Sequence, residues 1–128
     1  MSTARRPMTG DEARRIWAIT GRMSQGDLRA VDEQLDVAES YMHSEPWLWD
    51  SMIDNAIAHL VSFNVQLERA YLLAQERVEW CRDRSHLLQL ARVCRARGGK
   101  RYLAEAEELE LEAAHTENRH PDADDSEP

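Results

Sequence analysis

The stretch from Trp47 to Arg97 contains neither glycine nor proline. Both residues disfavour the interior of a helix, so helical structure can run through this stretch without a breaker. Apolar residues recur along most of the chain at spacings of three and four, and no segment alternates apolar and polar residues over the length of a strand. The sequence therefore predicts an all-α protein of five to six helices.

Two architectures fit the segment 46–83. In one, a single long helix carries a heptad seam, with Asn64 as a polar residue that sets the register, and forms a coiled-coil dimer. In the other, the chain turns near residues 62–65 and forms an antiparallel helical hairpin. Apolar residues that lie off the seam, such as Phe63 and Trp80, favour the hairpin, as does the usual helix length of about 11 to 12 residues.

The N-terminal region predicts a first hairpin. Thr9 and Glu12 have the spacing of a capping box, with Met8 placed to pack against Ala13, and Ser24 or Asp27 caps the second helix. The expected buried stripes are Ala13, Ile16, Trp17, Thr20 and Met23 on the first helix, and Leu28, Val31, Leu35, Ala38 and Met42 on the second.

Small and apolar residues repeat in the C-terminal half. The segment "IAHLV", with Ile57 and Val61, is followed 33 positions later by "LARVC", with Leu90 and Cys94, and Ala104 comes 34 positions after Ala70. In this respect residues 52–114 resemble a degenerate pair of tetratricopeptide-type repeats, whose period is about 34 residues. The resemblance implies helical hairpins with a concave face that binds a protein or peptide. None of that family's ligand-binding residues maps onto this chain.

"ARVCRARGGKRYLAEAEE", residues 91–108, contains two adjacent glycines between a basic and an acidic run. We expect Gly98 and Gly99 to supply a left-handed C-cap and a tight reversal between helices over 85–97 and 100–114. The facing stripes are Leu87, Leu90, Ala91 and Cys94 on one helix, and Tyr102, Ala106, Leu109 and Ala113 on the other. The glycine spacing does not match a phosphate-binding loop, and no strand precedes it.

The charge pattern offers a second hypothesis about function. The net charge is −8, but residues 82–101 hold seven bases against Asp83: Arg82, Arg84, Arg92, Arg95, Arg97, Lys100 and Arg101. This run would suit a small nucleic-acid-associated regulator. Arg92, Arg95 and Arg97 are expected to point in different directions, however, and no aromatic residue lies among them. Neutralisation by the acidic helix that follows is the simpler interpretation.

The expected partner-binding residues include two tryptophans. Trp47 and Trp49 are two residues apart on a helix, so both cannot share one buried face, and an exposed Trp is typical of binding hot spots. The complete set of candidate contacts is Trp47, Trp49, Arg92, Arg95, Arg97, Lys100 and Arg101.

No catalytic, cofactor-binding or metal-binding residue is predicted. Glu112 and His115 have a spacing used in di-iron helical bundles, but such a site also needs two further inward-facing glutamates, and His115 lies where the helix is expected to fray, so a solvated surface pair is expected. Cys81 and Cys94 are thirteen positions apart without a neighbouring ligand pair, which is unlike a zinc site. We expect both cysteines to be reduced core residues.

The expected organisation is a flexible segment over 1–8, one all-helical domain over 9–115 and a disordered acidic tail over 116–128. The sequence has no secretory signal and no apolar run that could span a membrane, so we expect a cytoplasmic protein. The predicted function is that of a small adaptor, regulator or inhibitor. Its partner would be another protein or peptide, with an acidic segment and a second copy of this chain as alternatives.

Overall fold

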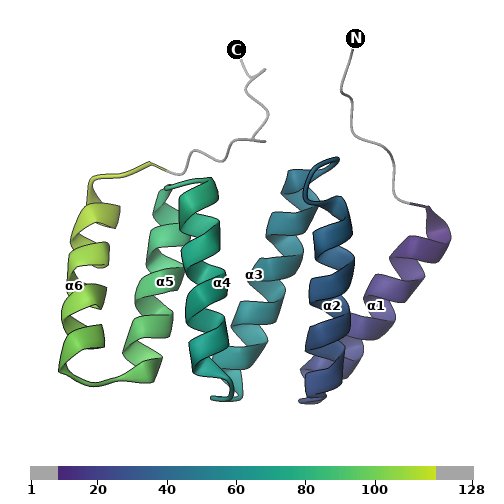
Figure 1. Ribbon diagram of the computed structural model, residues 1–128, viewed down its shortest axis with the longest axis horizontal. Coiled ribbons are helices and arrows are strands. Elements are labelled where there is room, and N and C mark those ends of the chain that lie inside the picture. Colours follow the sequence, from purple (N-terminus) through teal and green to yellow (C-terminus); the bar gives the residue numbers. More distant parts are fainter. Residues whose placement is uncertain (1–8, 118–128) are drawn as a thin grey trace, which may run out of the picture. The chain divides into compact units, whose positions relative to one another are not determined.

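The computed structural model describes residues 9–117. These residues form six helices and no strand (Figure 1): α1 (Gly10–Ser24), α2 (Leu28–Tyr41), α3 (Pro46–Ser62), α4 (Leu67–Trp80), α5 (Arg84–Arg97) and α6 (Lys100–Ala114). The all-helical prediction is confirmed. Within this described part, no helix combines the length and apolar character needed to cross a membrane. The predictions for Met8, for residues 1–8 and for the tail beyond 117 lie outside the described residues.

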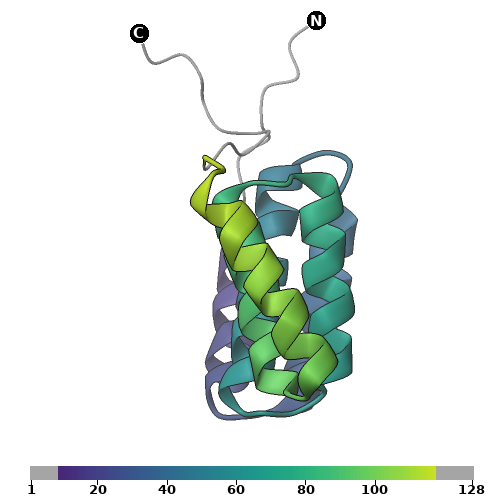
Figure 2. The same ribbon diagram turned by 90° about the vertical axis from the view of Figure 1, so that its left-hand side faces the viewer.

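The chain divides into two compact units, Met1–His59 and Leu60–Pro128. In the first unit α1 packs against α2. In the second, α5 packs against both α4 and α6, and Figure 2 looks onto α6 with α5 behind it. The single domain expected over 9–115 stays a prediction.

The first unit begins with the expected capping box. The Glu12 backbone N–H donates to Thr9 Oγ1 over 3.1 Å, and the Thr9 N–H donates to Glu12 Oε1 over 2.9 Å. At the start of α2, Asp27 accepts from the Arg29 N–H at 2.9 Å. Of the two caps proposed for this helix, Asp27 is therefore the one that forms.

The buried face of α1 differs from the predicted stripe. Ile19 and Met23 are buried, whereas Trp17 is 76 % exposed. Successive helical residues are turned by about 100°, so a face centred on Ile19 and Met23 leaves Trp17 outside it. The prediction for Trp17 was wrong because helical spacing alone does not determine on which residues the buried face is centred.

The face of α2 is also rotated from the expected one. Leu28 is 37 % exposed, while the buried side chains are Ala30, Val31, Gln34, Val37, Ala38 and Tyr41. Two polar groups hold this face in place: Gln34 Nε2 lies 3.5 Å from the Met52 carbonyl oxygen, and the Tyr41 hydroxyl donates to Glu12 Oε2 over 2.6 Å. The sequence analysis predicted a buried face that includes Leu28 and Leu35. It did not predict the hydrogen bonds of Gln34 and Tyr41.

The chain turns between α3 and α4, which confirms the turn predicted near residues 62–65 and excludes the single long helix over 46–83. Asn64 and Gln66 have left-handed backbone angles, with φ of 56° and 48°. A left-handed residue breaks the pattern of helical hydrogen bonds. The Val65 N–H instead bonds back to the Leu60 carbonyl over 3.0 Å, which closes the end of α3.

The α5–α6 hairpin follows the predicted stripes. Leu87, Leu90, Ala91 and Cys94 are buried on α5, and Ala106, Leu109 and Ala113 are buried on α6. Gly98 and Gly99 have positive φ values of 74° and 88°, as expected. Their ψ values of −178° and 158° are extended, however, so the predicted left-handed C-cap is replaced by an extended link.

Candidate functional site

The basic residues of α5 and its neighbours are largely engaged by the acidic helix α6. Arg95 donates twice to Glu110, through Nε at 2.7 Å and Nη2 at 2.6 Å. Arg82, just after α4, donates in the same two-pronged way to Glu112. These hydrogen bonds hold the pKa of both glutamates below its ordinary value. For Arg82 and Arg95, neutralisation by α6 is therefore what the structure shows.

Arg97 lies among aromatic rings. Its guanidinium carbon is 4.3 Å from the centroid of the Tyr102 ring and 5.4 Å from that of Tyr71, and the two rings meet edge to face. Arg101 lies 5.5 Å from the Tyr102 centroid. The Tyr71 hydroxyl donates to the Glu105 carboxylate over 2.9 Å, and burial, together with that carboxylate, raises the pKa of Tyr71 to about 12.

Three of the α5 side chains share one exposed face. Leu88, Arg92 and Arg95 follow one another at spacings of four and three and are all exposed. Arg97 is two residues beyond Arg95, about 200° further around the helix. The expectation of diverging directions is thus correct for Arg97 and wrong for Arg92 and Arg95.

A hollow in the surface lies beside this face. Its lining residues are Arg84, Leu88, Glu110, Ala113 and Ala114. Further apolar groups are exposed on α6, where Leu103 is 40 % and Leu111 is 66 % exposed. We call the surface formed by Leu88, Arg92, Arg95, Glu110 and Ala114 the α5–α6 face. The sequence pattern identified its arginines but missed Leu88, because nothing local distinguishes an exposed leucine from a buried one.

The two tryptophans of α3 differ in exposure. Trp49 is 2 % exposed and is a core residue, whereas Trp47 is only partly buried. Trp49 is therefore too buried to contact a partner, and only Trp47 remains a candidate partner-binding residue. Lys100 and Arg101 are both exposed in the first turn of α6.

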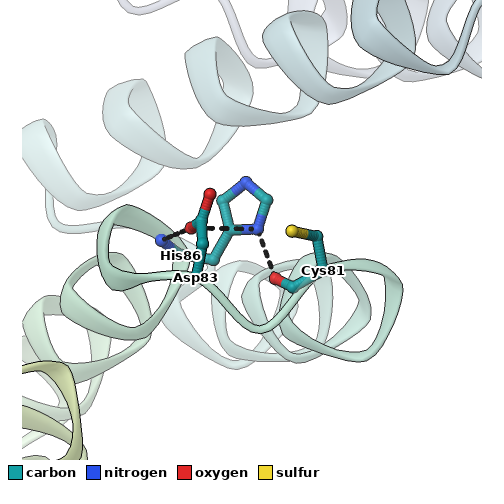
Figure 3. A group of neighbouring side chains, drawn as sticks. All are labelled: Cys81, Asp83 and His86. Carbon is teal, nitrogen blue, oxygen red and sulfur yellow. Dashed lines mark hydrogen bonds and ion pairs between the residues drawn. The ribbon is translucent and has the colours of Figure 1, made fainter. Parts of the chain in front are cut away.

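A compact group of three chemically reactive side chains lies in the link between α4 and α5 and in the first turn of α5. Cys81, Asp83 and His86 each offer one donor atom, and these three atoms lie within 4.8 Å of one another. Asp83 and His86 are buried, and Cys81 is partly buried. Figure 3 shows the imidazole ring between the Cys81 sulfur and the Asp83 carboxylate. The sequence analysis missed this group because it compared only the two cysteines with each other.

The local hydrogen bonds fix the orientation of this group. Asp83 is the N-cap of α5, since its Oδ1 accepts from the His86 N–H at 2.9 Å and from the Ser85 hydroxyl at 3.0 Å. His86 Nδ1 lies 2.6 Å from the Cys81 carbonyl oxygen and 3.6 Å from Asp83 Oδ1. A carbonyl can only accept, so in the neutral ring the proton is on Nδ1 and the lone pair is on Nε2.

Comparison with known proteins identifies no family. No family model, curated protein or solved structure matches this chain.

Proposed function

We propose that this chain is a non-catalytic protein–protein interaction module, an adaptor, regulator or inhibitor, that binds an acidic segment of a partner protein through the α5–α6 face. One observation carries the proposal: Leu88 is exposed on the same face as Arg92 and Arg95, at the edge of a surface hollow. The tetratricopeptide-like spacing of residues 52–114 is in keeping with it.

The chemistry of this face favours a mixed apolar and acidic ligand. Leu88 and Ala114 can cover an apolar side chain in the hollow, while Arg92, four residues after Leu88 on the same face of α5, can pair with a carboxylate. Arginine is enriched in protein interfaces, where its planar group binds carboxylates in a two-pronged manner. Trp47 is a candidate contact in the first unit.

The basic residues of segment 82–101 are less suited to binding a nucleic acid. Arg82 and Arg95 are paired with glutamates of α6, and Arg97 lies against Tyr71 and Tyr102. Pairing with phosphate would have to compete with these contacts. The net charge of −8 further opposes association with a polyanion.

The test has two steps. The immobilised full chain is used to capture proteins from a lysate of the source organism, and the affinity of each purified candidate is then measured for the wild type, Arg92→Glu and Arg29→Glu. Arg29 is exposed on α2 and serves as a matched charge reversal in the other unit. We expect Arg92→Glu to weaken binding at least about tenfold, the loss of one well-placed interface contact. Arg29→Glu should bind as the wild type does.

Equal weakening by both variants would indicate a general charge effect and contradict the proposed face. Labelled duplex and single-stranded DNA and RNA are titrated in parallel, between about 50 and 200 mM salt. Binding that falls steeply with salt and is lost in Arg92→Glu would support the nucleic-acid regulator in place of the protein module.

A further inference from the structure

We propose that two copies of this chain associate through the outer stripe of α6, with the two α6 helices antiparallel. The outer stripe consists of Lys100, Ala104, Glu107 and Leu111, which follow one another at spacings of four, three and four residues and are all exposed. Leu103, also exposed, lies beside it on the helix. The stripe shares no residue with the α5–α6 face, and the inference does not rest on the proposed docking function.

One side of α6 is packed and the opposite side is not. Ala106, Leu109 and Ala113 are buried where α6 packs against α5, and Figure 2 looks onto the outer side of α6 with α5 behind it. Leu111 lies on that outer side and is 66 % exposed. The described part of the second unit therefore leaves the outer stripe open to solvent.

The spacing of the stripe suits a second helix that lies along α6. Alternating spacings of three and four are those of helices that pack side by side over their whole length. In an antiparallel pair centred midway between Ala104 and Leu111, each Leu111 lies opposite the Ala104 of the second copy. The large side chain thus meets a small one at two equivalent places, and Leu103 adds apolar surface beside them. Such a two-fold contact closes on itself.

The charges of α6 run against its helix dipole. Its first turn contains Lys100 and Arg101 and no acidic residue, and its last turn contains no basic residue. A helix dipole favours the reverse arrangement. The end of α5 that adjoins this first turn does not compensate, because it contains Arg95 and Arg97. Neither Lys100 nor Arg101 forms an ion pair with another residue of segment 9–117.

An antiparallel second copy supplies the missing complement. The basic first turn of each α6 then lies beside the last turn of the other, which contains Glu112 and the negative end of the helix dipole. The two dipoles oppose each other, whereas a parallel pair would bring like ends together. The charge pattern therefore favours a second copy of this chain, in the antiparallel orientation, as the occupant of the outer stripe.

The size of the surface limits the strength of the contact. The 15 residues of α6 make a helix about 22 Å long. A single helix pair of this length buries less than the roughly 1,600 Å² of a standard interface, so we expect a weak dimer with a Kd of about 10 μM or higher. Glu107 weakens it further, because the two copies of this residue lie near the two-fold axis.

Analytical ultracentrifugation of the full chain tests the proposal. The protein is tag-free and kept reduced, so that Cys81 cannot form an intermolecular disulfide. Sedimentation is measured between about 10 μM and 1 mM, a range that spans the dissociation constant of a weak dimer. We expect the average mass to rise with concentration from that of one chain toward that of two.

The variants change exposed positions, so the fold is retained, and circular dichroism checks it. Leu111→Glu should raise the Kd at least about tenfold, since it places a charge against Ala104. Lys100→Glu should raise it about threefold or more, and Glu107→Ala should lower it by a similar factor, because like charges then meet or are removed. Leu72→Glu is the matched control: Leu72 is 58 % exposed on α4, and its replacement should leave the Kd unchanged.

A wild type that stays monomeric at the highest concentration would overturn the proposal. Equal weakening by Leu111→Glu and Leu72→Glu would place the contact elsewhere and would equally exclude the outer stripe. In a parallel pair each Lys100 would face its own counterpart, so unchanged association of Lys100→Glu would exclude the antiparallel arrangement. A Kd that does not fall in Glu107→Ala would contradict the position of the two-fold axis.

Discussion

Gly98 and Gly99 determine how the chain reverses between α5 and α6. Both combine a positive φ with an extended ψ, a region of backbone conformation that is essentially restricted to glycine. A Cβ atom added at either position would meet no other atom within 4 Å. The requirement for glycine therefore comes from the backbone angles and not from crowding.

Replacing Gly98 with alanine should lower the free energy of unfolding by about 1–3 kcal/mol, the usual cost of such a conformation for a residue with a side chain. Gly21→Ala is a control substitution for which we expect the opposite change in stability. Gly21 lies inside α1, where an added Cβ also meets nothing within 4 Å, so alanine should stabilise α1 by about 0.5–1 kcal/mol. Denaturant unfolding measures both. A neutral or stabilising Gly98→Ala would contradict this account of the turn.

At the scale of the helix, the N-terminus of α5 depends on one side chain. Asp83 accepts hydrogen bonds from the His86 N–H and the Ser85 hydroxyl, and it is buried. The four N–H groups at the start of a helix lack partners within that helix, so this cap satisfies a donor that would otherwise be buried without one.

Asp83→Ala should therefore destabilise the second unit by about 0.5–2 kcal/mol, the typical loss for an N-cap. Asp83→Asn should be close to the wild type, since asparagine caps equally well. Thermal and denaturant unfolding compare the two variants with the wild type. If both substitutions had the same effect, the negative charge of Asp83 would matter more than its capping hydrogen bond.

At the scale of the whole chain, charged pairs connect segments that are distant in sequence. Arg22 at the end of α1 bonds to both Asp27 and Glu33, while Arg95 and Arg82 bond to Glu110 and Glu112 of α6. The arginine hydrogen bonds lower the pKa of Asp27, Glu110 and Glu112. Each compact unit therefore contains at least one carboxylate that is more acidic when folded than when unfolded: Asp27 in the first, and Glu110 and Glu112 in the second.

This linkage makes the folded chain less stable in acid. A carboxyl group with a lowered folded pKa stabilises the protein above its ordinary pKa and loses that contribution as the pH falls through the folded value. The ordinary values are 4.5 for the two glutamates and 3.8 for Asp27, so the loss should begin near these pH values on acidification. Thermal unfolding between neutral and acidic pH measures it.

Glu110→Gln is the matched variant. Its Tm should lie slightly below that of the wild type at neutral pH, because this pair is exposed to solvent. The difference should vanish at a pH well below 4.5, where Glu110 is protonated in the folded wild type too. A difference that persists in acid would show that the substitution acts through packing and not through charge.

The local pattern was sufficient to predict the helices and most of their ends. Helix formation, capping at Thr9 and the glycine turn depend on neighbours within a few residues, so spacing alone reveals them. The buried stripes of α5 and α6 were also readable from the helical spacing of their apolar residues, although Leu88, Leu103 and Leu111 lie exposed outside them.

Tertiary structure decided what the local pattern leaves open. Trp17 is exposed and Gln34 is buried because packing against other helices selects which face of α1 and α2 is covered. Likewise, Cys81, Asp83 and His86 converge because the chain reverses between α4 and α5, and the orientation of side chains across that reversal is fixed in three dimensions. Periodicity records which residues share a helix face, but only the packed neighbours determine which face is buried.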